Sequence, residues 1–168
     1  MSQWVLGFRT LAWKKKIRLS YLAGAIDSDG YITFTVSNYR KNKGQAKNPD
    51  MYELIGLTQI TKIVPQLLKK EFGGCLFTEK SSTKNGKMLY TWRVSRVLAR
   101  KCIKELYPYL KIKKKQAKYL IRFESTVQRN NKPLSLAKLK QRQKLLTSLR
   151  SLNDIKGRFR NNYAYLLG

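Results

Sequence analysis

The residues best suited to chemistry are two aspartates, Asp27 and Asp29, in the stretch LAGAIDSDG at positions 22–30. They stand in a chain with 36 Lys and Arg against 9 Asp and Glu, and a formal net charge of +27. A chain this basic is expected to bind a polyanion. Because a carboxylate on such a surface repels phosphate, we expect a cation between them. The pattern predicts a divalent metal held by Asp29, with or without Asp27, against a nucleic-acid backbone, which is nuclease chemistry.

The composition fits a folded protein that binds nucleic acid. The chain has 168 residues, enough for one domain with a core, and 42% of them are hydrophobic. An anionic membrane surface is the rival partner for so basic a chain. However, the apolar runs are short and interrupted by Lys or Arg, so no membrane span is expected. The N-terminus has too short an apolar run for a secretory signal, whereas a transit peptide stays open.

Histidine is absent from the chain, and this excludes several catalytic arrangements. Nucleases that use His, zinc sites with His and Cys ligands, and triads with Ser or Cys beside His all require it. Water must therefore be activated by Asp, Glu, Lys, Tyr or a metal ion. The two cysteines, Cys75 and Cys102, are far apart and are expected to be reduced and partly buried.

The aspartates lie between a predicted helix and a predicted strand. Residues 17 to about 26 have apolar side chains at helical spacing, and residues 1–16 form a basic N-terminal extension. Residues 31–37 alternate between apolar and polar side chains, as in a strand with one buried face. The polar side carries Tyr31, Thr33, Thr35 and Ser37.

The remaining segments continue this pattern of paired strands and single helices. Thr61 could cap a helix that ends at Gly73-Gly74, and Ser95 could cap another. The predicted elements are a loop at 38–50, strands at 51–60, 75–80 and 88–95, and helices at 61–72, 96–106, 112–128 and 135–152. This order, αββαββα with additional C-terminal helices, predicts an α+β fold in which helices cover one face of an antiparallel sheet. The polar face is then free to enter a DNA major groove.

The stretch at 22–30 resembles the LAGLIDADG motif of homing endonucleases. Seven of the nine positions agree, and Ala25 and Ser28 differ. The segments 107–117 and 152–158 also resemble members that carry one motif and act as homodimers. The resemblance implies a single endonuclease domain over 17–168, the αββαββα homing-endonuclease fold, and a homodimer on a long pseudo-palindromic DNA target. It also implies a target in a ribosomal RNA gene interrupted by the intron that encodes the enzyme.

The small residues of the motif suit close packing of two such helices across a twofold axis. The expected dimer interface consists of Leu22, Ala23, Gly24 and Ala25. By resemblance, Asp29 is the direct metal ligand and the backbone carbonyl of Ser28 is a second one. Asp27 is expected to fix the helix end or the following loop rather than bind metal. Hard oxygen ligands favour Mg²⁺; Mn²⁺ is expected to substitute, and Ca²⁺ to bind without supporting cleavage.

Three further residues match active-site positions of the family. Gln59 corresponds to a polar residue that positions water, and Lys113 to a lysine that stabilises charge on the phosphate. Lys62 is the nearest counterpart of a basic residue that follows the Gln59 position. The expected DNA-binding residues are Tyr31, Thr33, Thr35, Ser37, Tyr39, Arg40, Lys41, Lys43, Lys62, Arg93, Lys111, Lys156, Arg158 and Arg160.

Simpler interpretations exist for each of these residues. The Asp27 and Asp29 pair could form only a turn, Lys113 could begin a helix, and Gln59 could cap one. The polar strand face could meet solvent alone, and the C-terminal cations could be a frayed basic tail. The charge balance and the motif favour the functional interpretation.

Two other functions use the same features. A maturase would share the fold and help an intron RNA to splice, and a basic structural protein would bind RNA without metal. The favoured partners are double-stranded DNA and a second copy of the chain, with intron RNA as a further candidate and no membrane. The expected location is intracellular, in a prokaryote with archaea included, or alternatively in an organelle matrix.

Overall fold

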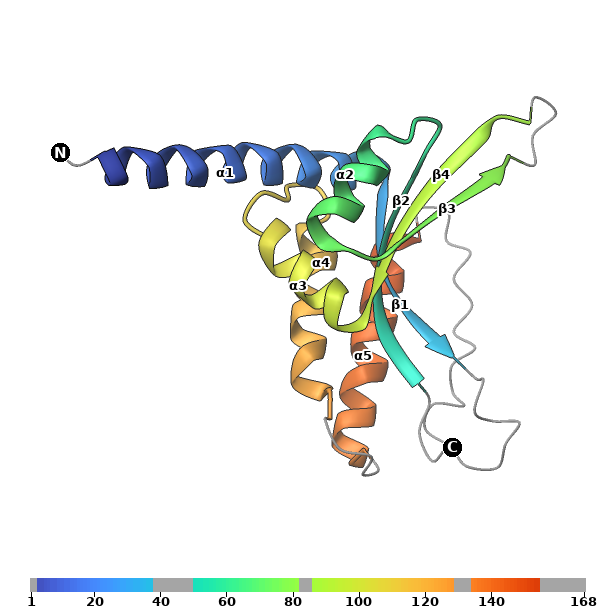
Figure 1. The fold of residues 1–168 in the computed structure, drawn as a ribbon. Coiled ribbons are helices and arrows are strands. Elements are labelled where there is room, and N and C mark those ends of the chain that lie inside the picture. The colour runs from blue at the N-terminus through green and yellow to red at the C-terminus, as the bar shows by residue number, and fades with distance from the viewer. Residues whose placement is uncertain (1–2, 38–49, 82–85, 129–133, 155–168) are drawn as a thin grey trace.

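The computed structural model describes residues 3–37, 50–81, 86–128 and 134–154. Helices and pairs of strands follow one another in the predicted order (Figure 1). The elements are α1 (Gln3–Asp29), β1 (Gly30–Ser37), β2 (Asp50–Gln59), α2 (Ile63–Phe72), β3 (Cys75–Lys80), β4 (Met88–Ser95), α3 (Arg96–Leu106), α4 (Lys114–Phe123), the 3₁₀ turn η2 (Glu124–Thr126) and α5 (Leu136–Asn153).

The four strands form one antiparallel sheet in the order β1-β2-β4-β3. The helices cover one face of this sheet, and the other face is left without a helical layer (Figure 1). The predicted α+β fold, with its antiparallel sheet and additional C-terminal helices, is therefore confirmed. We call the uncovered side, which carries Tyr31, Thr33 and Arg93, the free face.

Alternation along the strands separates the core from the free face. On β1, Ile32 and Phe34 are 1% and 2% exposed, whereas the intervening Tyr31 and Thr33 are half-buried. Trp92 on β4 is fully buried, and its indole N–H donates to the carbonyl of Gly73 at 2.8 Å. Burial of these large apolar side chains against the helices provides the main driving force for this arrangement.

The helix α1 is longer than the predicted segment of residues 17 to 26. It runs without a break from Gln3 to Asp29, because no Gly or Pro interrupts residues 8–23 and lysine has good helix propensity. Its N-terminal half projects away from the rest of the molecule (Figure 1). Within the described residues, none of the helices is sufficiently long and apolar to cross a bilayer.

Two helix boundaries differ from their predictions. The prediction that Thr61 caps a helix is wrong, since α2 begins at Ile63 with Lys62 at the cap position and no side-chain cap. The helix predicted over 112–128 is shorter and continues as the turn η2. The end of α2 matches its prediction, because Gly73 adopts a φ of 72°, which favours glycine.

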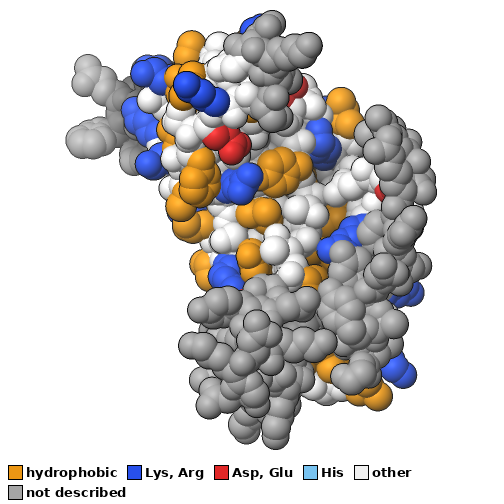
Figure 2. Space-filling view, turned by 90° about the vertical axis from the view of Figure 1, so that its right-hand side faces the viewer, with side chains coloured by type: hydrophobic (Ala, Val, Ile, Leu, Met, Phe, Trp, Pro, Cys, Tyr) orange, Lys and Arg blue, Asp and Glu red, His pale blue; other side chains and the backbone are white. Residues whose placement is uncertain are grey.

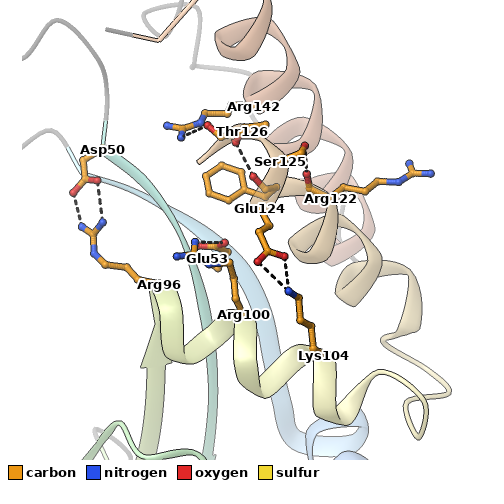
Figure 3. Close-up of polar contacts among 11 residues, drawn as sticks. Asp50, Glu53, Arg96, Arg100, Lys104, Arg122, Glu124, Ser125, Thr126 and Arg142 are labelled. Atoms are coloured by element: carbon orange, nitrogen blue, oxygen red, sulfur yellow. Dashed lines mark hydrogen bonds and ion pairs between the residues drawn. The ribbon is translucent and has the colours of Figure 1, made fainter. Parts of the chain in front are cut away.

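An ion cluster in the core joins the sheet to the helices (Figure 3). Glu53, on the buried face of β2, is 0% exposed and accepts hydrogen bonds from Arg100 of α3 at 2.8 and 3.0 Å. Arg142 of α5 lies close enough for its charge to act on Glu53, and it donates to Thr126 at 2.9 and 3.0 Å. Burial raises the pKa of Glu53, and the two arginines oppose this shift.

Candidate active site

Asp27 connects the end of α1 to the start of α4. Its side chain is buried at 7% exposure and accepts three backbone N–H bonds, from Lys111 at 2.6 Å, Ile112 at 3.2 Å and Lys113 at 2.8 Å. Both carboxylate oxygens take part in these bonds. Hydrogen bonds to an ionised acceptor are stronger than neutral ones, so this contact holds the segment before α4 in place. The expectation that Asp27 fixes a loop agrees with this geometry.

Asp29 has a different environment at the last position of α1. Its side chain is exposed, and the amide of Gln59 donates to Oδ2 at 2.8 Å. None of the ion pairs found among the described residues involves Asp29. The carboxylate is therefore oriented by a neutral partner and stays open to solvent.

Glycine is required where α1 turns into β1. A side chain on Gly30 would place its Cβ 2.8 Å from both the Cα atom and the carbonyl oxygen of Ile26. Since these are backbone atoms, they cannot move aside. The last residue of the motif therefore lets the helix end directly beside the strand that carries the free face, and Asp29 lies at that junction.

Lys113 lies against the carbonyl groups at the end of α1. Its ammonium donates to the carbonyl of Asp27 and, at 3.4 Å, to that of Ser28. Burial lowers the pKa of Lys113, while the charges of Asp27 and Asp29 oppose this shift. A cation at a helix C-terminus is favoured by the helix dipole. The ammonium thus lies within the cluster of oxygens rather than in solvent.

The structure brings together five of the predicted site residues from three elements. The end of α1 provides Asp27, Ser28 and Asp29, the end of β2 provides Gln59, and the residue before α4 provides Lys113. The interpretation of Gln59 as a helix cap is not supported, since its amide bonds to Asp29. The anchoring N–H groups of Lys111 and Ile112 had no separate signal in the sequence.

Two predicted basic residues lie near this cluster. Lys62 is exposed and follows Gln59 by three positions, in the bend before α2. The Lys111 side chain is exposed, while its backbone N–H is bound to Asp27. Neither side chain takes part in an ion pair among the described residues.

The free face holds the predicted strand residues. Tyr31, Thr33 and Thr35 alternate with the core residues of β1, and Arg93 of β4 is exposed on the same side. Figure 2 shows Lys and Arg spread among hydrophobic and uncharged polar side chains on this side of the molecule, where acidic side chains are scarce. Other predicted DNA contacts, which are the Ser37 side chain and the residues Tyr39, Arg40, Lys41, Lys43, Lys156, Arg158 and Arg160, lie outside the described part of the structure.

The four residues predicted at the dimer interface differ in their burial within the single chain. Leu22 and Ala23 are 0% exposed, because they pack on the side of α1 that faces the chain's own core. Gly24 is exposed, and a Cβ added there would meet nothing within 4 Å; Ala25 is half-buried. The exposed side of α1 instead presents an apolar stripe, which consists of Trp13, Ile17, Tyr21 and Gly24.

The donor set at the end of α1 suits a hard divalent cation. The Asp29 carboxylate and the Ser28 carbonyl both offer oxygen, which Mg²⁺ and Ca²⁺ prefer. Within the described ranges, no cluster of three or more His, Cys, Asp or Glu side chains could hold a metal. The described residues at the end of α1 thus offer these two oxygen donors without an acidic cluster around them.

Comparison with solved structures identifies the fold. No family model matches the chain, and no curated protein is similar to it in sequence. The homing endonuclease I-CvuI, solved with its target and calcium, has a TM-score of 0.68 at 18% identity, over 88% of this chain and 89% of that one. The archaeal intron-encoded homing endonuclease I-Vdi141I, complexed with DNA, has a TM-score of 0.68 at 20% identity, over 90% and 93%.

A more distant neighbour is the group I intron-encoded homing endonuclease I-CeuI, also complexed with DNA. Its TM-score is 0.57 at 12% identity, over 86% of this chain and 69% of that one. The chain therefore has the fold of the LAGLIDADG homing endonucleases. This confirms the fold that the motif at 22–30 implied.

Proposed function

We propose that the protein is a site-specific DNA endonuclease that acts as a homodimer and hydrolyses phosphodiester bonds with a divalent metal, Mg²⁺ in the cell. The observation that carries the proposal is the exposed Asp29 carboxylate, oriented by Gln59 at 2.8 Å, in a chain of net charge +27. An unpaired acid at the edge of a basic surface weakens phosphate binding unless it holds a cation. The shared fold with homing endonucleases solved on DNA supports the same function.

In this proposal Asp29 and the Ser28 carbonyl hold the metal, which when bound activates water and offsets charge on the scissile phosphate. I-CvuI has been solved with calcium and with magnesium. Gln59 orients Asp29 and can hydrogen-bond to a water molecule. Lys113 places a positive charge beside the same oxygens, where it can stabilise a phosphate that approaches them. Asp27 positions Lys113 by anchoring the backbone of the segment before α4.

Gly24 supports the homodimer. Glycine inside a helix costs about 1 kcal/mol relative to alanine, and nothing in the described part of the chain requires it, since a Cβ there would meet open space. Close approach of a second chain would account for the glycine. A second α1, packed along the stripe of Trp13, Ile17, Tyr21 and Gly24, would approach most closely at Gly24 and complete the metal site with its own Asp29.

The free face is the proposed DNA surface. A twisted antiparallel sheet with polar and basic side chains fits the major groove, where base pairs are distinguishable. Two copies related by a twofold axis would bind a long pseudo-palindromic site, and we place it at an intron insertion site in a ribosomal RNA gene. The salt dependence of binding should be steep, with a logarithmic slope of about −0.9 for each phosphate neutralised.

The cleavage test uses the full chain, Mg²⁺ and a plasmid library with a randomised insert. The wild-type protein should linearise a subset of plasmids whose ends share one sequence and carry short 3′ overhangs. Asp29→Asn should still bind those plasmids, while its cleavage rate falls by more than about a hundredfold. Glu124→Gln, which removes an acid far from the site, is the matched control and should cleave normally.

Equal cleavage by Asp29→Asn and the wild type would contradict the assignment of Asp29. If the wild type cleaved nothing and bound intron RNA, and Asp29→Asn did not change that binding, the maturase or the structural RNA-binding protein would replace the nuclease.

The dimer test uses substitutions at Gly24. Gly24→Ala should stabilise the isolated chain by up to about 1 kcal/mol and yet weaken the dimer, and Gly24→Leu should give a folded monomer without cleavage. Lys118→Leu, which adds the same side chain to an exposed site on α4, should stay dimeric. Sedimentation velocity measures the oligomeric state, and a dimer in Gly24→Leu would contradict this interface.

A further inference from the structure

One row of residues crosses the free face from strand to strand. Tyr31 of β1 pairs with Gly56 of β2, which pairs with Arg93 of β4. The neighbouring rows on either side belong to the core face of the sheet, as in the pair of Ile32 and Ile55, which are both buried. Because side chains alternate across a sheet, Tyr31 and Arg93 point to the same side, with the glycine between them.

The Tyr31 side chain lies directly over Gly56. A Cβ on Gly56 would be 2.3 Å from the Tyr31 hydroxyl oxygen and 2.4 Å from the ring carbon that carries it. Contacts this short are impossible, so any other residue would push Tyr31 away. The missing side chain of Gly56 therefore lets the phenol ring cross β2 and bring its hydroxyl to β4.

Arg93 is held from two directions on this face. Its guanidinium carbon lies 5.6 Å from the centre of the Phe77 ring on β3, which is within the range of a cation–π contact. On the other side, burial raises the pKa of Tyr31, and the charge and a hydrogen bond of Arg93 oppose this shift. The arginine thus has a hydrogen-bond partner and an aromatic neighbour, although its side chain is exposed.

We propose that Tyr31 is a positioning residue that aims the Arg93 guanidinium at the O6 and N7 atoms of one guanine in the DNA target. The inference rests on the proposed function, since it requires the free face to enter a major groove. Arginine makes a bidentate contact with guanine, and a side chain that is already oriented loses less conformational entropy on binding. In a homodimer this guanine occurs at two symmetric positions.

A base contact agrees better with the geometry than a phosphate contact. Arg93 lies on β4, one of the two inner strands of the sheet, rather than in a loop at the rim. A phosphate contact needs only a positive charge and tolerates a flexible side chain. The Tyr31 hydroxyl and the Phe77 ring instead restrict the orientation of the guanidinium, and a restricted orientation favours bidentate recognition.

The test is selection from a pool of duplexes with a fully randomised segment, in Ca²⁺, followed by sequencing of the bound fraction. The wild type should enrich guanine at one symmetric pair of positions. Arg93→Lys should keep most of the overall affinity and lose that preference by about tenfold to a hundredfold. Tyr31→Phe and Gly56→Ala should weaken the preference at the same pair and leave the other positions unchanged.

Tyr31→Phe removes only the hydroxyl, so it controls for any folding defect of Gly56→Ala. If Arg93→Ala lowered affinity equally for all sequences and Arg93→Lys restored it, Arg93 would be a phosphate contact and this inference would be wrong. If Tyr31→Phe kept the wild-type preference for guanine, Tyr31 would not position Arg93. If the wild type enriched no sequence at all, the proposed site-specific function would fail together with this inference. If the wild type enriched a sequence that the Tyr31 and Arg93 variants also prefer, only this inference would fail.

Discussion

The ion cluster around Glu53 and the end of α1 both place carboxylates in a strongly basic chain, but their surroundings differ. Glu53 is 0% exposed, and Arg100 holds it with two hydrogen bonds (Figure 3). Asp29 is exposed, and its partner is the neutral amide of Gln59. Both carboxylates are oriented, but only Glu53 forms an ion pair among the described residues.

This difference indicates which acid is available for chemistry. A carboxylate enclosed by arginines has its oxygens occupied and contributes to the packing of α3 and α5 against the sheet. A carboxylate oriented by an amide keeps its charge for an incoming cation. Asp27 is intermediate between them. It is buried like Glu53, but its carboxylate oxygens accept hydrogen bonds from neutral backbone N–H groups. Substitutions at or beside these carboxylates should therefore have different effects on folding and on cleavage.

The largest effect on folding is expected in the ion cluster. Arg100→Leu leaves the buried Glu53 with only Arg142 nearby, so the free energy of unfolding should fall by about 3–5 kcal/mol, while Asp29→Asn should change it by less than about 0.5 kcal/mol. Urea denaturation measures both. Replacing Glu53 and Arg100 together by leucine should recover most of the loss, and failure to recover it would show that packing rather than charge is responsible.

The same variant should depend on pH in a defined direction. The pKa of Glu53 in the folded chain lies above its ordinary value of 4.5, so its ionisation costs folding free energy as the pH rises through the folded pKa. Removing Arg100 withdraws one of the influences that lower this pKa. The deficit of Arg100→Leu should therefore be smaller at about pH 4 than at about pH 8. A larger deficit at the acidic pH would contradict the cause given for the shift.

Asp27→Asn should affect both stability and cleavage. An asparagine side chain has one acceptor oxygen for three backbone N–H donors, and its NH₂ group cannot accept a hydrogen bond from them. We therefore expect a loss of about 2 kcal/mol in unfolding free energy. Cleavage should also slow, because the segment that positions Lys113 is released. Denaturation and cleavage rates measure the two effects. Intact stability with lost cleavage would instead make Asp27 a metal ligand.

Gln59→Ala should reduce cleavage with little change in stability. Removing a group that orients a metal ligand typically costs about tenfold to a hundredfold in activity, and Gln59 lies at the exposed end of β2. Gln141→Ala on α5 is the control and should cleave at the wild-type rate. If both variants behaved alike, the hydrogen bond to Asp29 would have no functional role.

The two cysteines provide a smaller test of the same contrast between burial and exposure. Cys75 is exposed, while Cys102 is 0% exposed and its burial raises its pKa well above the usual value. A thiol reagent should therefore modify one cysteine quickly at neutral pH and the other only after unfolding. Cys75→Ser should abolish the fast reaction. A remaining fast reaction in that variant would mean that the core around α3 opens readily.

Strand boundaries could be predicted well because their signals are local. The segments 75–80 and 88–95 match β3 and β4 residue for residue, since side chains alternate between the two faces and glycines lie beyond the ends. The start of α1 could not be predicted in the same way. Lysines at positions 14–16 suit a helix and a disordered extension equally well, and only the folded chain shows that the helix continues through them.

The burial of motif residues also depended on tertiary contacts. Leu22 and Ala23 were expected at a dimer interface, because small and apolar residues suit both a helix pair and a core. The structure packs them against their own sheet and leaves Gly24 outside. A one-dimensional pattern shows that a helix has an apolar side, but it does not show what covers that side.

The linear chain by itself determined the fold class, the position of Asp29 between helix and strand, and the basic charge that points to nucleic acid, because these depend on neighbours in sequence or on composition. Only the tertiary structure decided the partners: Asp27 reaches the backbone of residue 111, which is 84 positions away, and Glu53 reaches Arg100 across 47. Such contacts form only when packing brings distant segments together. The local sequence of a segment does not indicate which distant group it will contact.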